Sequence, residues 1–126
     1  DTWGRAKVDA FVYEEGVSKE ARVIDFKTGR YDGNQESHRE QCELYGAVSL
    51  SRYPELEKIT TEMWYLDHGK IDRYIYTPES IKVKRERLNN RALAMTTATE
   101  FPATPSMFKC KWCYFGKQNM CREAAA

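Results

Sequence analysis

Two short segments of alternating polarity, residues 5–14 and 21–28, most constrain how this chain folds. In a strand, successive side chains point to opposite faces, so each segment is typical of a half-buried β-strand. The Glu15-Gly16 turn between them predicts that the two strands form a hairpin. In the first segment, Val8, Ala10 and Val12 would share one face, and Asp9, Phe11 and Tyr13 the other. In the second segment, Arg22, Ile24 and Phe26 would share one face, and Val23, Asp25 and Lys27 the other.

The next segments predict an alternation of helices and strands. A helix is expected over residues 35–52, because Gln41, Tyr45 and Val48 recur at helical spacing and Pro54 ends the pattern. Strands are expected over 56–67, where an apolar run over 63–66 suits a strand covered on both sides, and over 71–76. Thr77-Pro78-Glu79 then marks the start of a second helix, expected to reach about residue 99. Its buried stripe would be Ile81, Leu88, Ala92 and Met95, and the tail after it is expected to be irregular.

Length and composition favour one globular α/β domain over residues 1–123, with a cysteine-rich tail over 105–123. The three alanines at 124–126 are consistent with a cloning remnant. No apolar run approaches the roughly 18 residues of a membrane span, and no secretion signal is evident. We therefore expect no membrane association and a cytoplasmic location, in a bacterium or in the host of a phage.

Charge is divided unevenly along the chain. Residues 1–79 contain 11 Lys and Arg against 16 Asp and Glu, whereas residues 80–126 contain 9 against 3. A basic end suits a polyphosphate partner, because Lys and Arg displace counterions from nucleic acid. The alternative is that these residues form a solvated helix face.

The pair Asp25 and Lys27 carries the first chemical signal. Residues two apart in a strand share a face, so these side chains are neighbours. If the hairpin register brings Asp9 beside Asp25, two carboxylates converge as ligands for Mg²⁺ or Mn²⁺, which favour oxygen donors. Lys27 could then orient a water or stabilise charge at a phosphodiester. The alternative is an ordinary exposed ion pair, which contributes little to stability.

The order of these motifs resembles the PD-(D/E)XK nuclease superfamily, and most of all its RecB-like and CRISPR-associated exonuclease-like branch. The likeness rests on residues 4–9, on residues 23–29, and on Gln41 with Tyr45 four residues later. It implies a restriction-endonuclease-like core: a central mixed sheet of about four strands flanked by helices.

The resemblance also implies roles for individual residues. Asp9 and Asp25 would bind the metal together with the main-chain carbonyl of Phe26, and Lys27 would be the catalytic lysine. Gln41 would steady the lysine or the water, and Tyr45 would contact a phosphate. Members usually bring a further Glu or His from a helix before the first strand, but only residues 1–5 precede it here. Either an upstream helix has been cut away, or the site works with two acids, or activity is reduced, and weaker metal binding is the expected consequence.

The tail predicts a second metal site. Cys110 and Cys113, followed by Cys121, have the tight spacing of a metal knuckle. Nuclease relatives often hold an iron–sulfur cluster with three such cysteines and a fourth from upstream of the core. Zinc is the alternative, completed by Cys42, His38 or His68, although Cys42 is better interpreted as a small buried side chain.

These features favour a Mg²⁺- or Mn²⁺-dependent deoxyribonuclease, acting as an exonuclease or endonuclease in recombination, repair or phage DNA processing. Single-stranded DNA or duplex ends would be bound by basic and aromatic residues of the second helix and the tail, and a helicase or another recombination protein would be a partner. Two alternatives are a weakly active or inactive DNA-binding module with the same fold, and an interaction domain with a vestigial site. The candidate DNA-binding residues are Lys84, Arg85, Arg87, Arg91, Lys109, Lys111 and Trp112.

Overall fold

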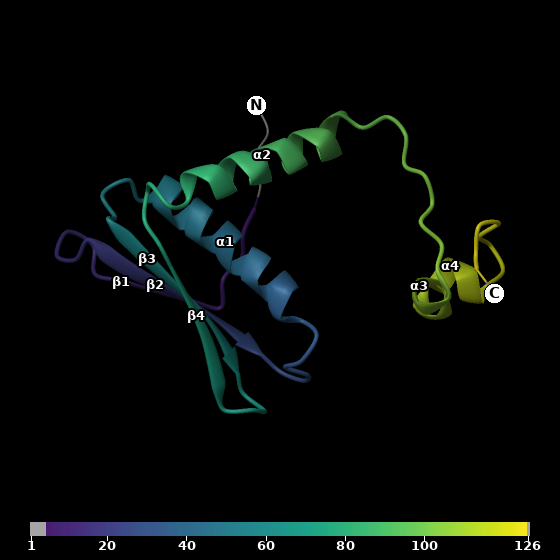
Figure 1. Ribbon diagram of the computed structural model, residues 1–126, viewed down its shortest axis with the longest axis horizontal. Coiled ribbons are helices and arrows are strands. Elements are labelled where there is room, and N and C mark those ends of the chain that lie inside the picture. Colours follow the sequence, from purple (N-terminus) through teal and green to yellow (C-terminus); the bar gives the residue numbers. More distant parts are fainter. Residues whose placement is uncertain (1–4, 126) are drawn as a thin grey trace. The chain divides into compact units, whose positions relative to one another are not determined.

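The chain divides into two compact units, Asp1–Thr96 and Thr97–Ala126, in a computed structural model that describes residues 5–125 (Figure 1). Gly4 of the first motif and the last alanine of the terminal run lie outside the described residues. The first unit holds a four-stranded sheet, and the second holds the cysteine-rich tail.

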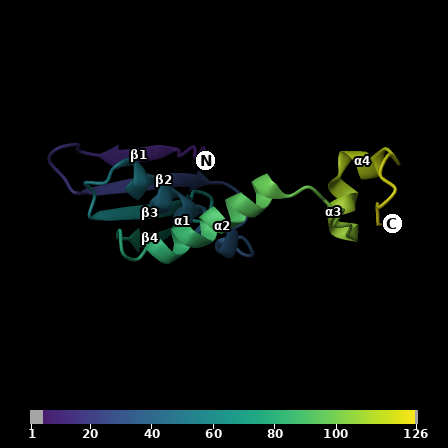
Figure 2. The same cartoon turned by 90° about the horizontal axis from the view of Figure 1, so that it is seen from above.

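The first unit is built on a mixed sheet whose strands follow one another in chain order, as Figure 2 shows. β1 pairs antiparallel with β2, β2 pairs parallel with β3, and β3 pairs antiparallel with β4. The strands are β1 (Ala10–Tyr13), β2 (Glu20–Lys27), β3 (Lys58–Tyr65) and β4 (Lys70–Tyr76). This arrangement confirms the predicted mixed sheet of an α/β fold, and the antiparallel pair β1–β2 is the predicted hairpin.

Helix α1 (Gln35–Arg52) makes the crossover between the parallel strands β2 and β3 and covers one face of the sheet. Its bounds are those predicted from the spacing of Gln41 and Tyr45 and from Pro54. The core lies between α1 and the sheet, and its fully buried side chains include Val23, Ile59, Met63 and Cys42. The same face of the sheet carries Asp25 and Lys27, so the predicted chemistry lies at the edge of the core.

Helix α2 (Lys82–Thr97) lies beside α1, on the side away from the sheet (Figures 1 and 2). The predicted start signal forms hydrogen bonds, since the hydroxyl of Thr77 accepts from Ser80 N at 3.2 Å and Ser80 Oγ accepts from Thr77 N at 2.8 Å. The helix nevertheless begins later than predicted, at Lys82, after a turn over residues 78–81. The predicted buried stripe is wrong at its far end, because Met95 is 74% exposed. Ile81, just before α2, is fully buried, and no residue of α2 itself is. The second half of α2 extends past the core, so its apolar residues have no core to pack against.

Strand β1 is shorter than predicted, because residues 5–9 leave the sheet. The Phe26 N–H of β2 is bound by a side chain instead of by the backbone of β1, because the carboxylate Oδ2 of Asp9 accepts it at 2.9 Å. The strand over 56–67 is likewise shorter, and it is covered on one face only. Met63 and Tyr65 are buried under α1, whereas Trp64 is partly exposed and Leu66, beyond the strand, is 55% exposed.

The second unit contains two short helices where an irregular tail was predicted. They are α3 (Met107–Trp112) and α4 (Tyr114–Lys117). Ser106 caps α3, since its side chain accepts from Lys109 N at 3.1 Å. Among the described residues, no helix is both long and apolar enough to cross a membrane.

Replacing Gly46 by Ala tests the packing of α1 on β4. An added Cβ would lie 2.6 Å from Cδ2 of the buried Tyr76 ring, which cannot move aside without disturbing the core. Gly to Ala in a helix otherwise stabilises by about 1 kcal/mol. We expect the clash to reverse this sign and to lower the free energy of unfolding by about 1–3 kcal/mol in urea titrations. The exposed control Ser51→Ala should change it by no more than about 0.5 kcal/mol, and a stabilised Gly46→Ala would contradict the packing.

Candidate active site

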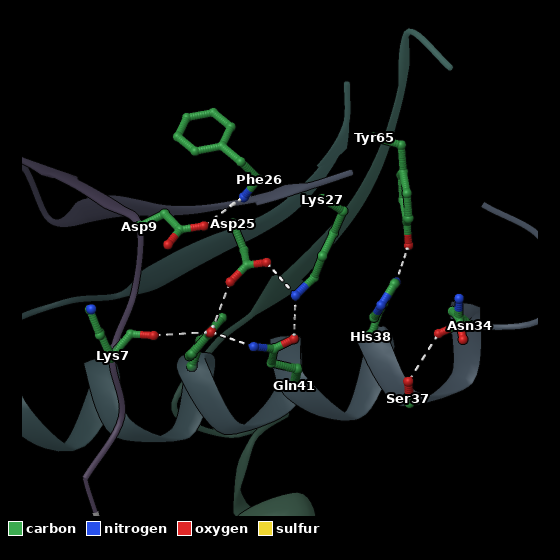
Figure 3. A network of polar contacts seen from close by, with 11 residues as sticks. Lys7, Asp9, Asp25, Phe26, Lys27, Asn34, Ser37, His38, Gln41 and Tyr65 are labelled. Atoms are coloured by element: carbon green, nitrogen blue, oxygen red, sulfur yellow. Dashed lines mark hydrogen bonds and ion pairs between the residues drawn. The ribbon is translucent and has the colours of Figure 1, made fainter. Parts of the chain in front are cut away.

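The two predicted acids lie side by side at one end of the β1–β2 pair. Strand β1 begins where Ala10 pairs with Ile24, so Asp9, the residue before it, lies at the end of β2 that carries Asp25. Figure 3 shows their side chains next to one another, with Lys27 close by. The hairpin therefore brings together the three residues that the alternating pattern singled out.

Asp25 is the most constrained member of the group. Its side chain is 5% exposed, and its two oxygens have different neighbours. Oδ1 accepts from the Tyr45 hydroxyl at 2.9 Å, and Oδ2 lies 2.6 Å from the ammonium of Lys27. A buried carboxylate needs such partners, because an unpaired charge in a core is costly.

Gln41 joins the lysine to the tyrosine. Lys27 Nζ donates to Gln41 Oε1 at 2.9 Å, and Gln41 Nε2 donates to the Tyr45 oxygen at 2.6 Å (Figure 3). These residues are four apart on α1, so both reach the same side of the helix. Asp25, Lys27, Gln41 and Tyr45 thus form a closed ring of polar contacts, which we call the Asp25 ring.

Tyr45 acts as a donor in this ring. Burial, followed by the hydrogen bond to Asp25, raises the pKa of its hydroxyl to about 12. The hydroxyl therefore keeps its proton at neutral pH. The carbonyl of Lys7 lies 3.1 Å from the same oxygen, which positions the segment leading to Asp9 against α1.

Asp9 and the backbone of Phe26 complete the set of oxygen donors. Asp9 is exposed and uses Oδ2 to accept the Phe26 N–H. In a strand, the N–H and C=O of one residue point to the same side, so the Phe26 carbonyl is directed toward β1 and Asp9. The residues before Ala10 do not pair with β2, so no β1 ladder pair includes Phe26, and its carbonyl lies on the side of the two acids.

These donors fit a hard divalent cation. Asp25 Oδ2 is buried and has no hydrogen bond of good geometry among the described residues, although Lys27 lies beside it. Two carboxylates and a main-chain carbonyl are the ligand types that Mg²⁺ and Mn²⁺ prefer. Within residues 5–125 no third acid, histidine or cysteine joins them as a metal-binding group. Among these residues, the set is therefore two carboxylates and one main-chain carbonyl.

His38 belongs to this neighbourhood and was missed as a site residue. Its Nδ1 lies 2.8 Å from the Tyr65 hydroxyl, and burial together with the charge of Lys27 lowers its pKa. It was considered only as a zinc ligand or a solvated side chain. The available signal was its spacing, because His38 precedes Gln41 by three residues and so shares its helix face.

The basic residues of α2 mostly have partners within the protein. Lys84 donates to the buried carboxylate of Glu43 at 2.6 Å, and Arg87 binds the same carboxylate. Arg91 lies 3.4 Å from Glu40. Arg85 forms no ion pair among the described residues, and its Nε is buried without a partner. Of the four α2 residues predicted to bind nucleic acid, only Arg85 is without a carboxylate.

The tail cysteines and the proposed fourth ligands are placed as follows. Cys110 Sγ accepts from Ala125 N at 3.4 Å, and the described residues contain no group of three cysteines, histidines or acids able to hold a metal. Cys42 is fully buried in the core, as its preferred interpretation predicted, and burial raises its pKa to about 11. His68 Nε2 lies 2.8 Å from the carbonyl of Gly29.

The aromatic and basic residues of the tail lie on its surface. Trp112 is 67% exposed, and the ammonium groups of Lys111 and Lys117 lie 5.5 and 5.3 Å from the centre of its ring. Lys109 binds the side chain of Thr104 at 3.4 Å. An exposed ring flanked by cations remains compatible with the predicted contact to nucleic-acid bases.

A mixed sheet crossed by one helix carries an acid on β2, a lysine two residues on and a second acid just before β1, which is the arrangement that the sequence predicted for a nuclease. A family model for the PD-(D/E)XK nuclease superfamily matches residues 5–122. The chain belongs to this superfamily, which confirms the broader part of the predicted resemblance. Its members are nucleases that typically use divalent metals.

Comparison with solved structures adds only a distant likeness. One match, "Crystal structure of SSO0001", has a TM-score of 0.38 and 21% sequence identity over 84% of this chain. The chain covers 46% of the length of that protein. No curated protein matches the chain significantly.

His38 predicts how stability changes with pH. Its pKa in the folded protein lies below the ordinary value of 6.5, so the unfolded chain binds this proton more readily. This contribution to stability is complete above that value and is lost as the pH falls below it. His38→Gln should therefore show a smaller drop in melting temperature than wild type between about pH 7.5 and about pH 5.5. Equal drops in both proteins would contradict the assignment.

Proposed function

We propose that this protein is a Mg²⁺- or Mn²⁺-dependent deoxyribonuclease of the RecB-like, CRISPR-associated exonuclease-like branch. The Asp25 ring is the observation that carries the proposal: a buried acid, a lysine, a glutamine and a tyrosine held in mutual contact beside Asp9. A structural ion pair alone would need neither the glutamine nor the second acid.

Each residue has a role in the proposed reaction. Asp9, Asp25 and the Phe26 carbonyl would hold the cation, which when bound lowers the pKa of a coordinated water and polarises a phosphoryl oxygen. Lys27 orients the attacking water and stabilises the negative charge that develops on the phosphate. Gln41 holds the Lys27 ammonium in place, and Tyr45 would contact a phosphate.

The expected substrate is DNA, single-stranded or at duplex ends, since the superfamily resemblance favours DNA over RNA. Recombination, repair and phage DNA processing are the proposed settings, with a helicase or another recombination protein as the partner. Asp9 is exposed, so a strand can approach it from solvent. We propose that residues 1–123, including the cysteine-rich tail, act as one nuclease domain. The proposed location is the cytoplasm.

Cleavage assays test the proposal. Wild type is expected to cleave labelled single- or double-stranded DNA in Mn²⁺, and Lys27→Ala and Asp25→Ala should lower the rate by at least about 100-fold, because they remove charge stabilisation and a metal ligand. Lys19→Ala is the matched control, since Lys19 forms an exposed ion pair with Glu57 at 2.6 Å. Thermal unfolding checks that each variant is folded. Cleavage that persists in Lys27→Ala would refute the proposed role.

The small ligand set favours a second candidate, a DNA-binding module with weak or no catalysis. Two acids without a third charged ligand bind a divalent cation less tightly. DNA binding by wild type without cleavage at any Mn²⁺ concentration would select this candidate. An interaction domain with a vestigial site would show neither activity.

The tail metal is a separate proposal, either an iron–sulfur cluster or zinc bound by Cys110, Cys113 and Cys121. Thiolate clusters suit both metals. Anaerobically purified protein should be brown with iron or colourless with stoichiometric zinc by elemental analysis. Cys113→Ser should lose the metal, whereas Cys42→Ser, which changes a thiol in the core, should retain it. Protein that contains neither metal would eliminate the site.

A further inference from the structure

The first unit contains a groove between α1 and α2, away from the Asp25 ring. It has a volume of about 530 Å³. Leu44 and Val48 of α1 and Leu88 of α2 line it, and Arg52 and Arg85 contribute one guanidinium each from the two helices. An apolar floor with two cations suits a ligand that is both anionic and partly apolar.

The two arginines differ from their basic neighbours. Lys84, Arg87 and Arg91 are paired with glutamates of α1, as described above. Neither Arg52 nor Arg85 forms an ion pair with any carboxylate in the part of the chain that the structure describes. Arg52 lies over the ring of Tyr53, 5.8 Å from its centre, which leaves its hydrogen-bond donors available.

Arg85 carries an independent sign of a missing acceptor. Its Nε is buried and has no hydrogen-bond partner among the described residues. Leaving a buried donor unsatisfied costs free energy, and more when the group is charged. An acceptor supplied from outside, such as a phosphate oxygen, would remove this cost.

A second hollow lies next to the groove. Its volume is about 250 Å³, and Val48 and Arg52 line both hollows. Phe11, Tyr45 and Tyr53 also line it, and Tyr45 donates to Asp25. Aromatic walls beside cations are the combination that binds single-stranded nucleic acid.

We propose that the two hollows form a track that binds a single strand of DNA leading to or from the active site, with Arg52 and Arg85 contacting its phosphates. Only the position at which the bound strand would be cleaved rests on the proposed function. Eleven residues separate Gln41 from Arg52, which corresponds to about 16 Å along α1. About five nucleotides at B-form spacing would cover this length.

A strand of DNA explains the site better than an acidic helix from a partner protein. Such a helix would use the apolar floor and the arginines of the groove. It would not account for the aromatic hollow, which is lined by Arg52 and by Tyr45 of the Asp25 ring. A strand that reaches the active site accounts for both hollows.

Salt dependence of binding tests the track directly. Fluorescence anisotropy with a fluorescein-labelled single strand in EDTA measures binding without cleavage. Each phosphate contact to a single strand contributes about 0.7 to the slope of log K against log salt. The double variant Arg52→Gln/Arg85→Gln should therefore lower the slope by about 1.4 and weaken binding about tenfold or more.

Two further variants separate charge from packing. Arg85→Lys keeps the charge and should retain most of the slope. If Arg85 acts only through its packing, Arg85→Lys should instead lower binding as much as Arg85→Gln does. Lys58→Gln removes a charge from the other face of the sheet, where Lys58 pairs with Glu20 at 2.7 Å, and should leave the slope at the wild-type value.

The outcomes distinguish the track from the catalytic proposal. A wild-type slope in the double variant, or an equal loss in Lys58→Gln, would overturn the track even if the protein cleaves DNA. The track would also be overturned if wild type bound an acidic peptide through these arginines while the double variant kept the wild-type salt slope for DNA. A lowered slope in a protein that does not cleave DNA would support the track and reject the nuclease.

Discussion

The contact between Asp25 of β2 and α1 is the interaction on which both the fold and the site depend. Asp25 lies under the helix, where a charge is tolerated only with close partners. Tyr45 binds Asp25 directly, and Gln41, one helical turn earlier, binds the Lys27 that pairs with Asp25. The packing of α1 on the sheet and the assembly of the Asp25 ring are therefore one structural event, and a change that displaces α1 also disrupts the ring.

Buried carboxylates recur elsewhere in this unit, each with cations around it. Glu43 binds α2 to α1 through Lys84 and Arg87, and Glu62, 1% exposed on the other face of the sheet, is held by Arg22 and Arg73. Breaking a buried pair from one side is strongly destabilising. Ile81, just before α2, and the partly buried Leu88 pack on the core, and these ion pairs add to that contact in holding the first turns of α2 in place.

Sequence reasoning succeeded where the information is local. The alternation around Asp9 and Asp25 and the helical spacing of Gln41 and Tyr45 depend on backbone periodicity, and the hairpin and α1 follow it closely. It failed where the outcome depends on distant partners. Nothing local shows that the Asp9 side chain ends β1 by binding the Phe26 N–H. Likewise, nothing near Met95 shows that the core ends before it, so its helical spacing predicted burial that the tertiary structure does not provide.

The geometry of the Asp25 ring also explains why the glutamine is needed. Asp25 has one oxygen bound to Tyr45 and the other beside Lys27, so a divalent cation on this carboxylate would share it with an ammonium group. Two cations on one carboxylate repel each other, most strongly where water is excluded. In the proposed reaction, the hydrogen bond from Lys27 to Gln41 Oε1 would keep the lysine in place when a cation occupies Asp25. A neutral acceptor at this position would not compete for that cation, whereas a third carboxylate on α1 would.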